Sequence, residues 1–288
     1  MITIFHHLDR EQADLFSLVL QSAGIGNRVI RSSDGFCIQV PEASAGPARD
    51  AVLRYQLENP ANEVESPAIA RFSASRHLSG VAVALLLLSI HLAVSASAAP
   101  SDYLTVFGAN ARRILNGEMY RCVTALLLHA DAAHLAGNMA GIVLFGSAVC
   151  GIVGTGLGWL AILGCGALGN LINAIAHETG HLSVGASTAV FGAVGLLCAL
   201  QAVYAVRTGQ GWRQVFLALG GGLGLLAFLG ASVRSDLGAH LFGFLVGLLA
   251  GGAYGLWVQR PLGRHAQVLC GTIAALVILW SWLRGAVS

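Results

Sequence analysis

The chain has 288 residues, of which 56% are hydrophobic and only 10% are charged, and its mean hydropathy is +0.72. Soluble proteins average about 25% charged residues, so a wholly soluble protein is excluded. The formal net charge is only +2 and the basic residues form no cluster, which argues against nucleic acid as a partner.

The charged residues are unevenly spread and divide the chain into two parts. Residues 1–76 contain nine acidic residues and seven arginines, more than half of the 30 charges. We therefore expect a small domain at 1–60, a linker at 61–76 and a membrane domain at 77–288. Acidic residues at 9, 11 and 14 interrupt the first 20 residues, so we expect no signal peptide and a cytoplasmic first domain.

The first domain shows alternating strand and helix signals. Asp9, followed three residues later by Gln12, is typical of a helix start, and Gly24 is a plausible stop. The turn signal Ser33-Asp34-Gly35 predicts a hairpin. The expected elements are a strand at 2–8, a helix between Asp9 and Gly24, a hairpin at 26–40 and a helix at 42–57. This order predicts a small α+β (βαββα) soluble domain, and it contains no catalytic constellation.

Seven apolar runs follow, each close to the roughly 20 residues that a membrane helix needs. They cover residues 79–98, 133–153, 156–176, 187–206, 213–231, 238–257 and 266–284. Glycines recur at four-residue intervals at 137 and 141 and again at 243, 247 and 251. In lipid, such spacing lets helix backbones approach one another closely.

The loops between these runs predict the orientation. Six arginines in short loops fall on one side of the membrane if the N-terminus is inside: Arg71, Arg76, Arg207, Arg213, Arg260 and Arg264. Residues 100–122 are too polar to cross the membrane and too long for a simple turn. We expect them to lie in the outer interface.

Polar side chains lie at the start of three alternate runs. The second run starts with His134 and Asn138, the fourth with Ser187, and the sixth with Asp236 and His240. Because these helices run in the same direction, their first residues share the outer side. Polar groups at membrane depth usually face the bundle interior or a hydrated cavity, so we expect them to converge in one pocket.

The residue types suit nucleophilic catalysis. A serine hydroxyl needs an adjacent base, and His240 is the candidate base for Ser187. Attack on a peptide carbonyl creates an oxyanion that needs hydrogen-bond donors. The first N–H groups of a helix have no internal partner, so Ser187 brings one donor. His134 and Asn138, four residues apart on one helix face, can supply two more, and Gly185 permits the tight chain entry that exposes the hydroxyl.

Four short motifs occur in order along the membrane part. They are Tyr120-Arg121, the run His129 to Asn138 with its H-x-x-x-N ending, Gly185-Ala186-Ser187, and Asp236 to Gly243. On these motifs, residues 77–288 resemble the rhomboid intramembrane serine proteases. The resemblance implies an α-helical polytopic membrane protein with a rhomboid-like six-helix bundle plus one C-terminal helix.

The resemblance also implies roles for single residues. Ser187 and His240 would form a catalytic dyad without an essential acid, and His134 and Asn138 would line the oxyanion hole. The sites expected to support them are Gly185, Gly243 and Arg121. One departure is visible, because Thr188 stands where the family usually has glycine after the nucleophile.

The expected activity is that of a serine endopeptidase which cleaves single-pass transmembrane proteins near the outer face, through an acyl-enzyme. No cofactor or metal is expected. The expected location is a bacterial inner membrane, within the lipid bilayer and with the N-terminal domain in the cytoplasm.

Plainer interpretations stand beside these. Ser187 could be a helix cap, Asn138 could join helices by hydrogen bonding, and Asp236 could be a cap or solvated loop residue rather than a group that orients His240. Arg121 could be an interface anchor or a tie for residues 100–122.

Other histidines are expected to be structural or to lie in polar loops. His177 and His181 have metal-ligand spacing without an evident third ligand, whereas His91 and His129 are expected to be structural. For the whole protein, the alternatives are a catalytically silent rhomboid-like protein that binds membrane clients and a small transporter. The sequence shows no inverted repeat that would favour a transporter.

Overall fold

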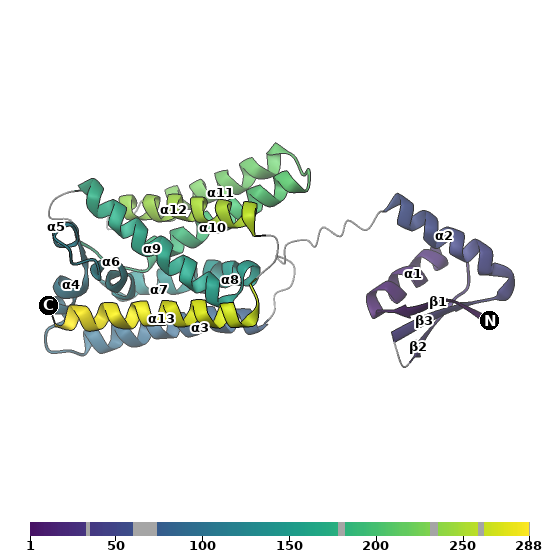
Figure 1. Ribbon diagram of the computed structural model, residues 1–288, viewed down its shortest axis with the longest axis horizontal. Helices are drawn as coiled ribbons and strands as arrows, with labels where there is room; N and C mark the ends of the chain where they lie inside the picture. Colours follow the sequence, from purple (N-terminus) through teal and green to yellow (C-terminus); the bar gives the residue numbers. More distant parts are fainter. Residues whose placement is uncertain (33–34, 60–73, 178–181, 231–235, 259–261, 288) are drawn as a thin grey trace. The chain divides into compact units, whose positions relative to one another are not determined.

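The computed structural model describes residues 1–32, 35–59, 74–177, 182–230, 236–258 and 262–287. The chain forms two compact units, Met1–Glu65 and Ser66–Ser288. The first contains a three-stranded sheet and the second contains the long apolar helices (Figure 1).

The N-terminal unit combines an antiparallel sheet with two helices. Its elements are β1 (Ile2–Leu8), α1 (Arg10–Ser22), β2 (Arg28–Ser32), β3 (Gly35–Val40), a 3₁₀ turn (Glu42–Ser44) and α2 (Ala45–Glu58). Strand β3 lies between β1 and β2 and pairs antiparallel with both. The predicted βαββα order is confirmed, while the hairpin residues 33–34 lie outside the described residues.

Helix α1 begins where the sequence predicted, and for the predicted reason. The Asp9 carboxylate accepts the Gln12 backbone N–H at 2.7 Å, and the Gln12 side chain accepts the Asp9 N–H at 3.3 Å. These two bonds satisfy backbone donors that the helix cannot pair internally. Gly24, with φ +72°, follows the helix end. The core of this unit is an ordinary apolar cluster that includes Phe16, Leu20 and Ile38.

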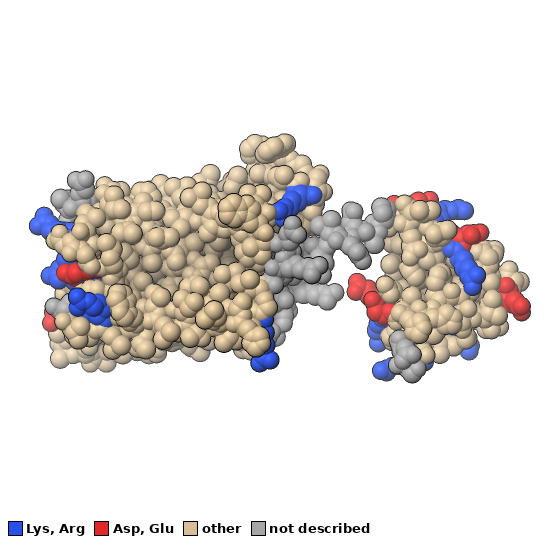
Figure 2. All heavy atoms as spheres, viewed as in Figure 1, with Lys and Arg blue, Asp and Glu red and all other residues tan. Residues whose placement is uncertain are grey.

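The second unit is a helical bundle. Its long helices are α3 (Ala74–Ser95), α7 (Ala132–Gly141) continued by α8 (Ser147–Val153), α9 (Thr155–His177), α10 (Ser187–Arg207), α11 (Trp212–Gly230), α12 (Leu237–Trp257) and α13 (Arg264–Ala286). On the face shown in Figure 2, the charged side chains of this unit lie towards the two ends of the helices. The flank between them is uncharged, as a surface in hydrocarbon requires.

Six of the described helices are long and apolar enough to cross a membrane. The fifth predicted run is α11, whose described apolar stretch covers Trp212–Phe228 and is shorter than the other six. The prediction placed this run at 213–231, and residue 231 lies outside the described residues. The six spans make this a multi-pass membrane protein.

The second predicted run is one continuous helix with a wider turn in its middle. Ile142–Gly146 forms a π-helical turn between α7 and α8. Such turns are rare and occur often near functional sites. The sequence gives no signal for this one.

Residues 100–128 fold into short elements rather than into a span. They are α4 (Pro100–Phe107), β4 (Ala109–Asn110), α5 (Ala111–Leu115), α6 (Arg121–Thr124) and a 3₁₀ turn (Ala125–Leu127). Strand β4 pairs antiparallel with β5 (Leu182–Ser183). The polar segment is thereby joined to the chain that leads into α10.

Helices α10 and α12 pack backbone against backbone. A Cβ atom at Gly247 would collide with the Gly192 carbonyl oxygen, and one at Gly195 would collide with the Phe244 carbonyl oxygen. The predicted close approach through glycines is therefore confirmed for this pair. In the other predicted pair, Gly141 lies against the Val190 side chain, but Gly137 faces open space. The prediction was wrong for Gly137, because its side of α7 packs against no described residue.

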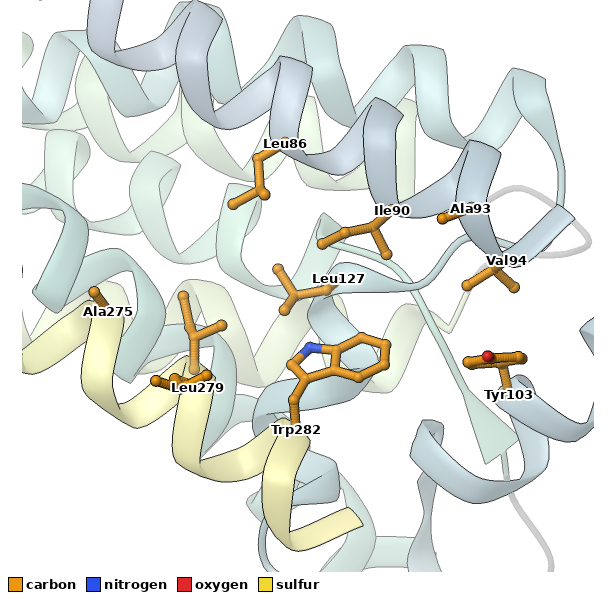
Figure 3. A pocket seen from close by; sticks show the side chains of 10 residues that line it. Leu86, Ile90, Ala93, Val94, Tyr103, Leu127, Ala275, Leu279 and Trp282 are labelled. Atoms are coloured by element: carbon orange, nitrogen blue, oxygen red, sulfur yellow. The ribbon is translucent and has the colours of Figure 1, made fainter. Parts of the chain in front are cut away.

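Helices α3 and α13 line an apolar cavity of about 490 Å³, shown in Figure 3. Its walls include Leu86 and Ile90 of α3 and Leu279 and Trp282 of α13, with Tyr103 at one end. None of the predicted site residues lines this cavity. It is therefore separate from the polar pocket that the sequence predicts.

Candidate active site

Ser187 and His240 meet although 53 residues separate them. Ser187 is the first residue of α10 and His240 lies in the first turn of α12. The distance between Ser187 Oγ and His240 Nε2 is 2.7 Å, so the hydroxyl is placed to donate to the imidazole. His240 is 4% exposed, and the Phe191 ring packs on it with centroids 4.8 Å apart.

The helix-cap interpretation of Ser187 does not match its position. The N-cap of α10 is Ala186, and no side chain makes a capping hydrogen bond there. The Ser187 hydroxyl instead points to His240.

The chain enters α10 through a tightly held glycine. Gly185 has φ +126°, a conformation that favours glycine, and its N–H donates to the Ala125 carbonyl at 2.9 Å. The next N–H, of Ala186, donates to His129 Nε2 at 3.4 Å. These bonds fix the residues just before Ser187 against the 100–128 segment.

His134 and Asn138 converge on the same glycine. A Cβ atom at Gly185 would lie 2.6 Å from His134 Cε1 and 3.3 Å from Asn138 Nδ2. Asn138 is 5% exposed, and its Nδ2 has no hydrogen-bond partner among the described residues. A buried amide donor without a partner is costly. This one lies beside Gly185, two residues before the nucleophile in the chain, where it can serve an oxygen that arrives with a substrate.

Helix α7 presents these donors because it starts at a defined residue. Asp131 is its N-cap, and the Asp131 carboxylate accepts the His134 N–H at 2.8 Å. His134 and Asn138 then lie one turn apart on one face.

His129 takes part in the site more directly than the sequence indicated. It is 5% exposed, and its ring lies edge-on to His134, with centroids 5.4 Å apart. Burial, together with His134 and His91, lowers the pKa of His129 to about 4, so the ring is neutral at pH 7. A neutral imidazole can accept the Ala186 N–H, and this supports the structural role predicted for His129.

Thr188 does not project into the pocket. It is 2% exposed, and its Cγ2 lies beside Gly169 of α9 and Gly243 of α12, where a Cβ atom at either glycine would come within 3.0 Å of it. A Cβ at Gly243 would also collide with the Thr188 carbonyl oxygen. The two glycines therefore accommodate the side chain that departs from the family pattern.

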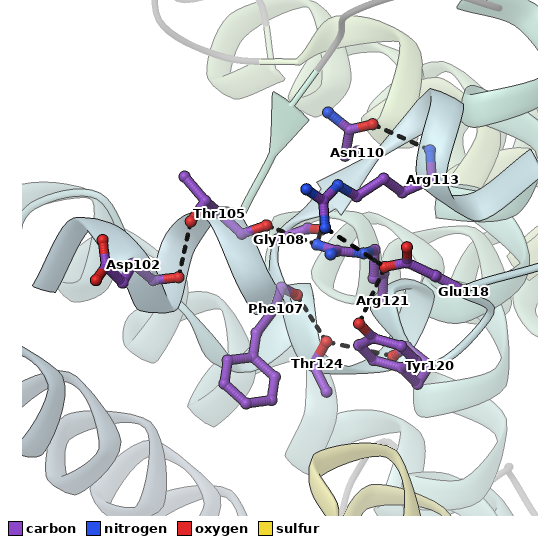
Figure 4. Close-up of polar contacts among 10 residues, drawn as sticks. All are labelled: Asp102, Thr105, Phe107, Gly108, Asn110, Arg113, Glu118, Tyr120, Arg121 and Thr124. Carbon is purple, nitrogen blue, oxygen red and sulfur yellow. Dashed lines mark hydrogen bonds and ion pairs between the residues drawn. The ribbon is translucent and has the colours of Figure 1, made fainter. Parts of the chain in front are cut away.

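Arg121 is 1% exposed and lies in the network of polar contacts shown in Figure 4. Its Nε donates to Glu118 at 2.6 Å, and its Nη1 donates to the carbonyls of Thr105 and Gly108 at 2.8 and 3.1 Å. Burial opposes ionisation of Glu118, but the bonds from Arg121 and Tyr120 outweigh it and lower the Glu118 pKa. Of the two interpretations given above, the tie for residues 100–122 is the one that matches these contacts.

The remaining polar residues have plainer positions. Asp236 is the N-cap of α12. His177 Nδ1 lies 3.0 Å from the Asn173 carbonyl, and His181 falls outside the described residues. Within the described ranges, no group of three His, Cys, Asp or Glu side chains is placed to hold a metal ion.

Fold and site together define a class: a multi-pass membrane protein in which two separate spans bring a serine hydroxyl and an imidazole into hydrogen-bonding distance. Comparison with known proteins identifies the family within this class. Residues 116–257 match the Rhomboid domain. This match excludes the N-terminal unit and α13.

Several curated proteins are similar to this chain. The candidate rhomboid protease YdcA of Bacillus subtilis is 32% identical over 145 residues, which cover 50% of this chain and 71% of YdcA. Rhomboid-like protease 2 of Toxoplasma gondii is 28% identical over 184 residues, 62% of each chain. The rhomboid protease GluP of Bacillus subtilis is 28% identical over 187 residues, which cover 62% of this chain and 35% of GluP. The chain thus spans less than two thirds of the latter two relatives, and it belongs to the rhomboid family.

Proposed function

We propose that this protein is an intramembrane serine endopeptidase which cleaves transmembrane segments of single-pass membrane proteins. The observation that carries the proposal is the 2.7 Å contact between Ser187 Oγ and His240 Nε2, made at a part-buried position between two helices. Family membership supports the same reaction class.

The first step is attack on the scissile carbonyl. Ser187 Oγ forms a bond to the carbonyl carbon while its proton passes to His240 Nε2, and the carbonyl π electrons move to the oxygen. His240 is the base, and no acidic residue is assigned as a third member of the site. The Phe191 ring on the imidazole limits its rotation.

The second element is stabilisation of the resulting oxyanion. The donors available are the side chains of His134 and Asn138 and the backbone N–H of Ser187. Each aimed donor contributes about 3–4 kcal/mol to transition-state stabilisation in sites of this type.

Collapse of the tetrahedral intermediate completes acylation. The C–N bond breaks, the protonated His240 gives its proton to the leaving amine, and an acyl-enzyme remains on Ser187. Water then adds to the ester carbon, with His240 taking its proton. Cleavage of the ester bond returns the proton to Ser187 Oγ and releases the new carboxyl terminus.

The substrate must expose a peptide carbonyl that its own helix normally satisfies. We therefore expect cleavage at small or helix-breaking residues of a transmembrane segment, near the outer face. The proposed location is a bacterial inner membrane with the N-terminal unit in the cytoplasm. The arginines of the short loops support this orientation.

The test is cleavage of a panel of tagged transmembrane substrates by the purified full chain in proteoliposomes. We expect discrete products that Ser187→Ala and His240→Ala both abolish. Cleavage that survives Ser187→Ala contradicts the assignment. Binding of the panel without any cleavage by the wild-type chain would favour the silent client-binding alternative.

A further inference from the structure

Asp236 holds the start of the helix that carries His240. Its Oδ1 accepts the Ala239 backbone N–H at 3.0 Å, and its own carbonyl accepts the His240 N–H at 3.1 Å. The residue is half-buried. The first turn of α12, and with it the backbone of the proposed base, is therefore built on this one residue.

A second side chain, from a different helix, binds the same carboxylate. Asn173 of α9 donates from Nδ2 to Asp236 Oδ2 at 2.7 Å and is itself only 3% exposed. A short hydrogen bond to an ionised acceptor is stronger than one between neutral groups. Because Asn173 lies within α9, this bond ties the start of α12 to a span that carries neither Ser187 nor His240.

The contact is close enough to constrain the position of α12. A Cβ atom at Gly238 would lie 2.5 Å from Asn173 Oδ1 and 2.9 Å from His177 Cε1. The Asn173 and His177 side chains of α9 therefore lie directly against the backbone of the first turn of α12. A small movement of this turn would change the 2.7 Å distance between Ser187 Oγ and His240 Nε2.

We propose that Asn173 and Asp236 form a positioning pair that sets the location of His240 relative to Ser187. The inference rests on the proposed function of Ser187 and His240. In a catalytic triad an acid orients the imidazole by direct contact. Here Asp236 caps α12 through the Ala239 N–H and binds Asn173 of α9, so the pair holds the backbone of the turn that carries His240.

The experiment exchanges the two side chains. Asn173→Asp alone places two carboxylates opposite each other and loses the bond. Asp236→Asn alone replaces the bond to a carboxylate by a weaker bond between two amides. In the double variant, N173D with D236N, the amide and the carboxylate change places and the bond can form again. Residue 236 keeps an oxygen for the Ala239 N–H in every case.

The readouts are the second-order rate constant of fluorophosphonate labelling at Ser187, the kcat and KM of substrate cleavage, and the thermal midpoint in detergent. We expect Asn173→Asp to label and cleave about 10- to 100-fold more slowly at unchanged KM, because small displacements of reacting groups have effects of this size. Asp236→Asn is expected to slow both rates by a smaller factor, because a weaker bond remains. The double variant is expected to recover most of the rate. All rates are measured below the lowest thermal midpoint, so that loss of folding is not mistaken for loss of position.

Asp9→Asn is the matched control, because Asp9 makes the same N-cap bond in the N-terminal unit. It should label at the wild-type rate. Single variants that label at the wild-type rate, a double variant that recovers nothing, or an effect confined to KM would each overturn the positioning role. These outcomes leave the proposed function intact as long as the wild-type chain labels at Ser187. Failure of the proposed function itself would appear as wild-type protein that does not label at Ser187.

Discussion

The two units start a helix with the same residue in opposite surroundings. Asp9 caps α1 at an exposed position, where only a local capping box depends on it. Asp236 caps α12 at a half-buried position, where it also binds a buried asparagine of another span. A polar side chain at the surface of the first unit therefore indicates local structure. In the bundle it indicates a tertiary contact, because polar groups at membrane depth need partners.

The units also differ in how their cores are packed. The N-terminal unit buries large side chains such as Phe16, Leu20 and Ile38 between sheet and helices. At the site, the bundle instead brings backbones together through Gly195, Gly243 and Gly247. Substitutions in the first unit should therefore affect the stability of that unit alone, whereas substitutions at these glycines should affect both stability and activity.

The largest effect is expected at the serine and histidine of the site. Ser187→Ala and His240→Ala should each lower kcat for substrate cleavage by several orders of magnitude, about 10⁶-fold in comparable serine enzymes. The thermal midpoint should remain near that of the wild type. The matched control is Ser17→Ala in the N-terminal unit, where the hydroxyl bonds the side chains of Asn27 and Gln21. An equal loss of kcat in Ser187→Ala and Ser17→Ala would contradict a special role for Ser187.

A smaller loss is expected at the donors on α7. Asn138→Ala removes the buried amide that faces the pocket, and His134→Ala removes its neighbour. Each should lower kcat by about 10²- to 10³-fold with little change in KM, because the donors act on the transition state. Steady-state kinetics measure this. If Asn138→Ala lowered only the thermal stability, the alternative would be favoured, in which Asn138 joins helices by hydrogen bonding.

The glycine packing gives the sharpest comparison within one helix. Gly243→Ala should destabilise the bundle by about 1–3 kcal/mol and slow labelling, because its Cβ would collide with the carbonyl of Thr188, next to the nucleophile. Gly252→Ala, also on α12 but facing open space, should leave both unchanged or raise stability. Thermal unfolding in detergent and labelling rates test the pair. Equal effects at both positions would contradict backbone packing as the cause.

The buried histidine predicts a pH dependence. Because the pKa of His129 is about 4 in the folded protein and ordinarily 6.5, the unfolded chain binds more protons between these values. Stability should therefore fall as pH decreases, by about 2 kcal/mol from pH 6.5 to pH 5 for this residue. His129→Gln keeps an acceptor for the Ala186 N–H but does not titrate, so its pH profile should be flatter. Parallel profiles for the two proteins would exclude His129 as the source.

The smallest effect is expected in the N-terminal unit. Asp9→Ala should cost about 1 kcal/mol of that unit's stability, since it removes one cap. Cleavage by the bundle should not change. Hydrogen exchange of α1 amides measures the stability of the N-terminal unit, and the substrate assay measures the rate of cleavage.

Much of this arrangement could be predicted from residue patterns. The capping box at Asp9, the succession of apolar helices and the shared end of His134, Ser187 and His240 all depend on local spacing or helix direction. The packing of Gly243 against Thr188 also follows the predicted glycine spacing.

What could not be predicted depends on contacts between distant segments. The π turn at 142–146, the pairing of β4 with β5 and the bond from Asn173 to Asp236 leave no periodic trace in the sequence. Likewise, Arg121 is one arginine among 16 until its buried position is known.

The most direct test maps the adduct that a fluorophosphonate leaves on the full-length protein. Intact-mass and peptide mass spectrometry of wild type should show one phosphonyl group, on Ser187, and His240→Ala should show almost none in the same time. An adduct on any other residue, or equal modification of Ser187 with and without His240, would contradict the pairing of this hydroxyl with this imidazole.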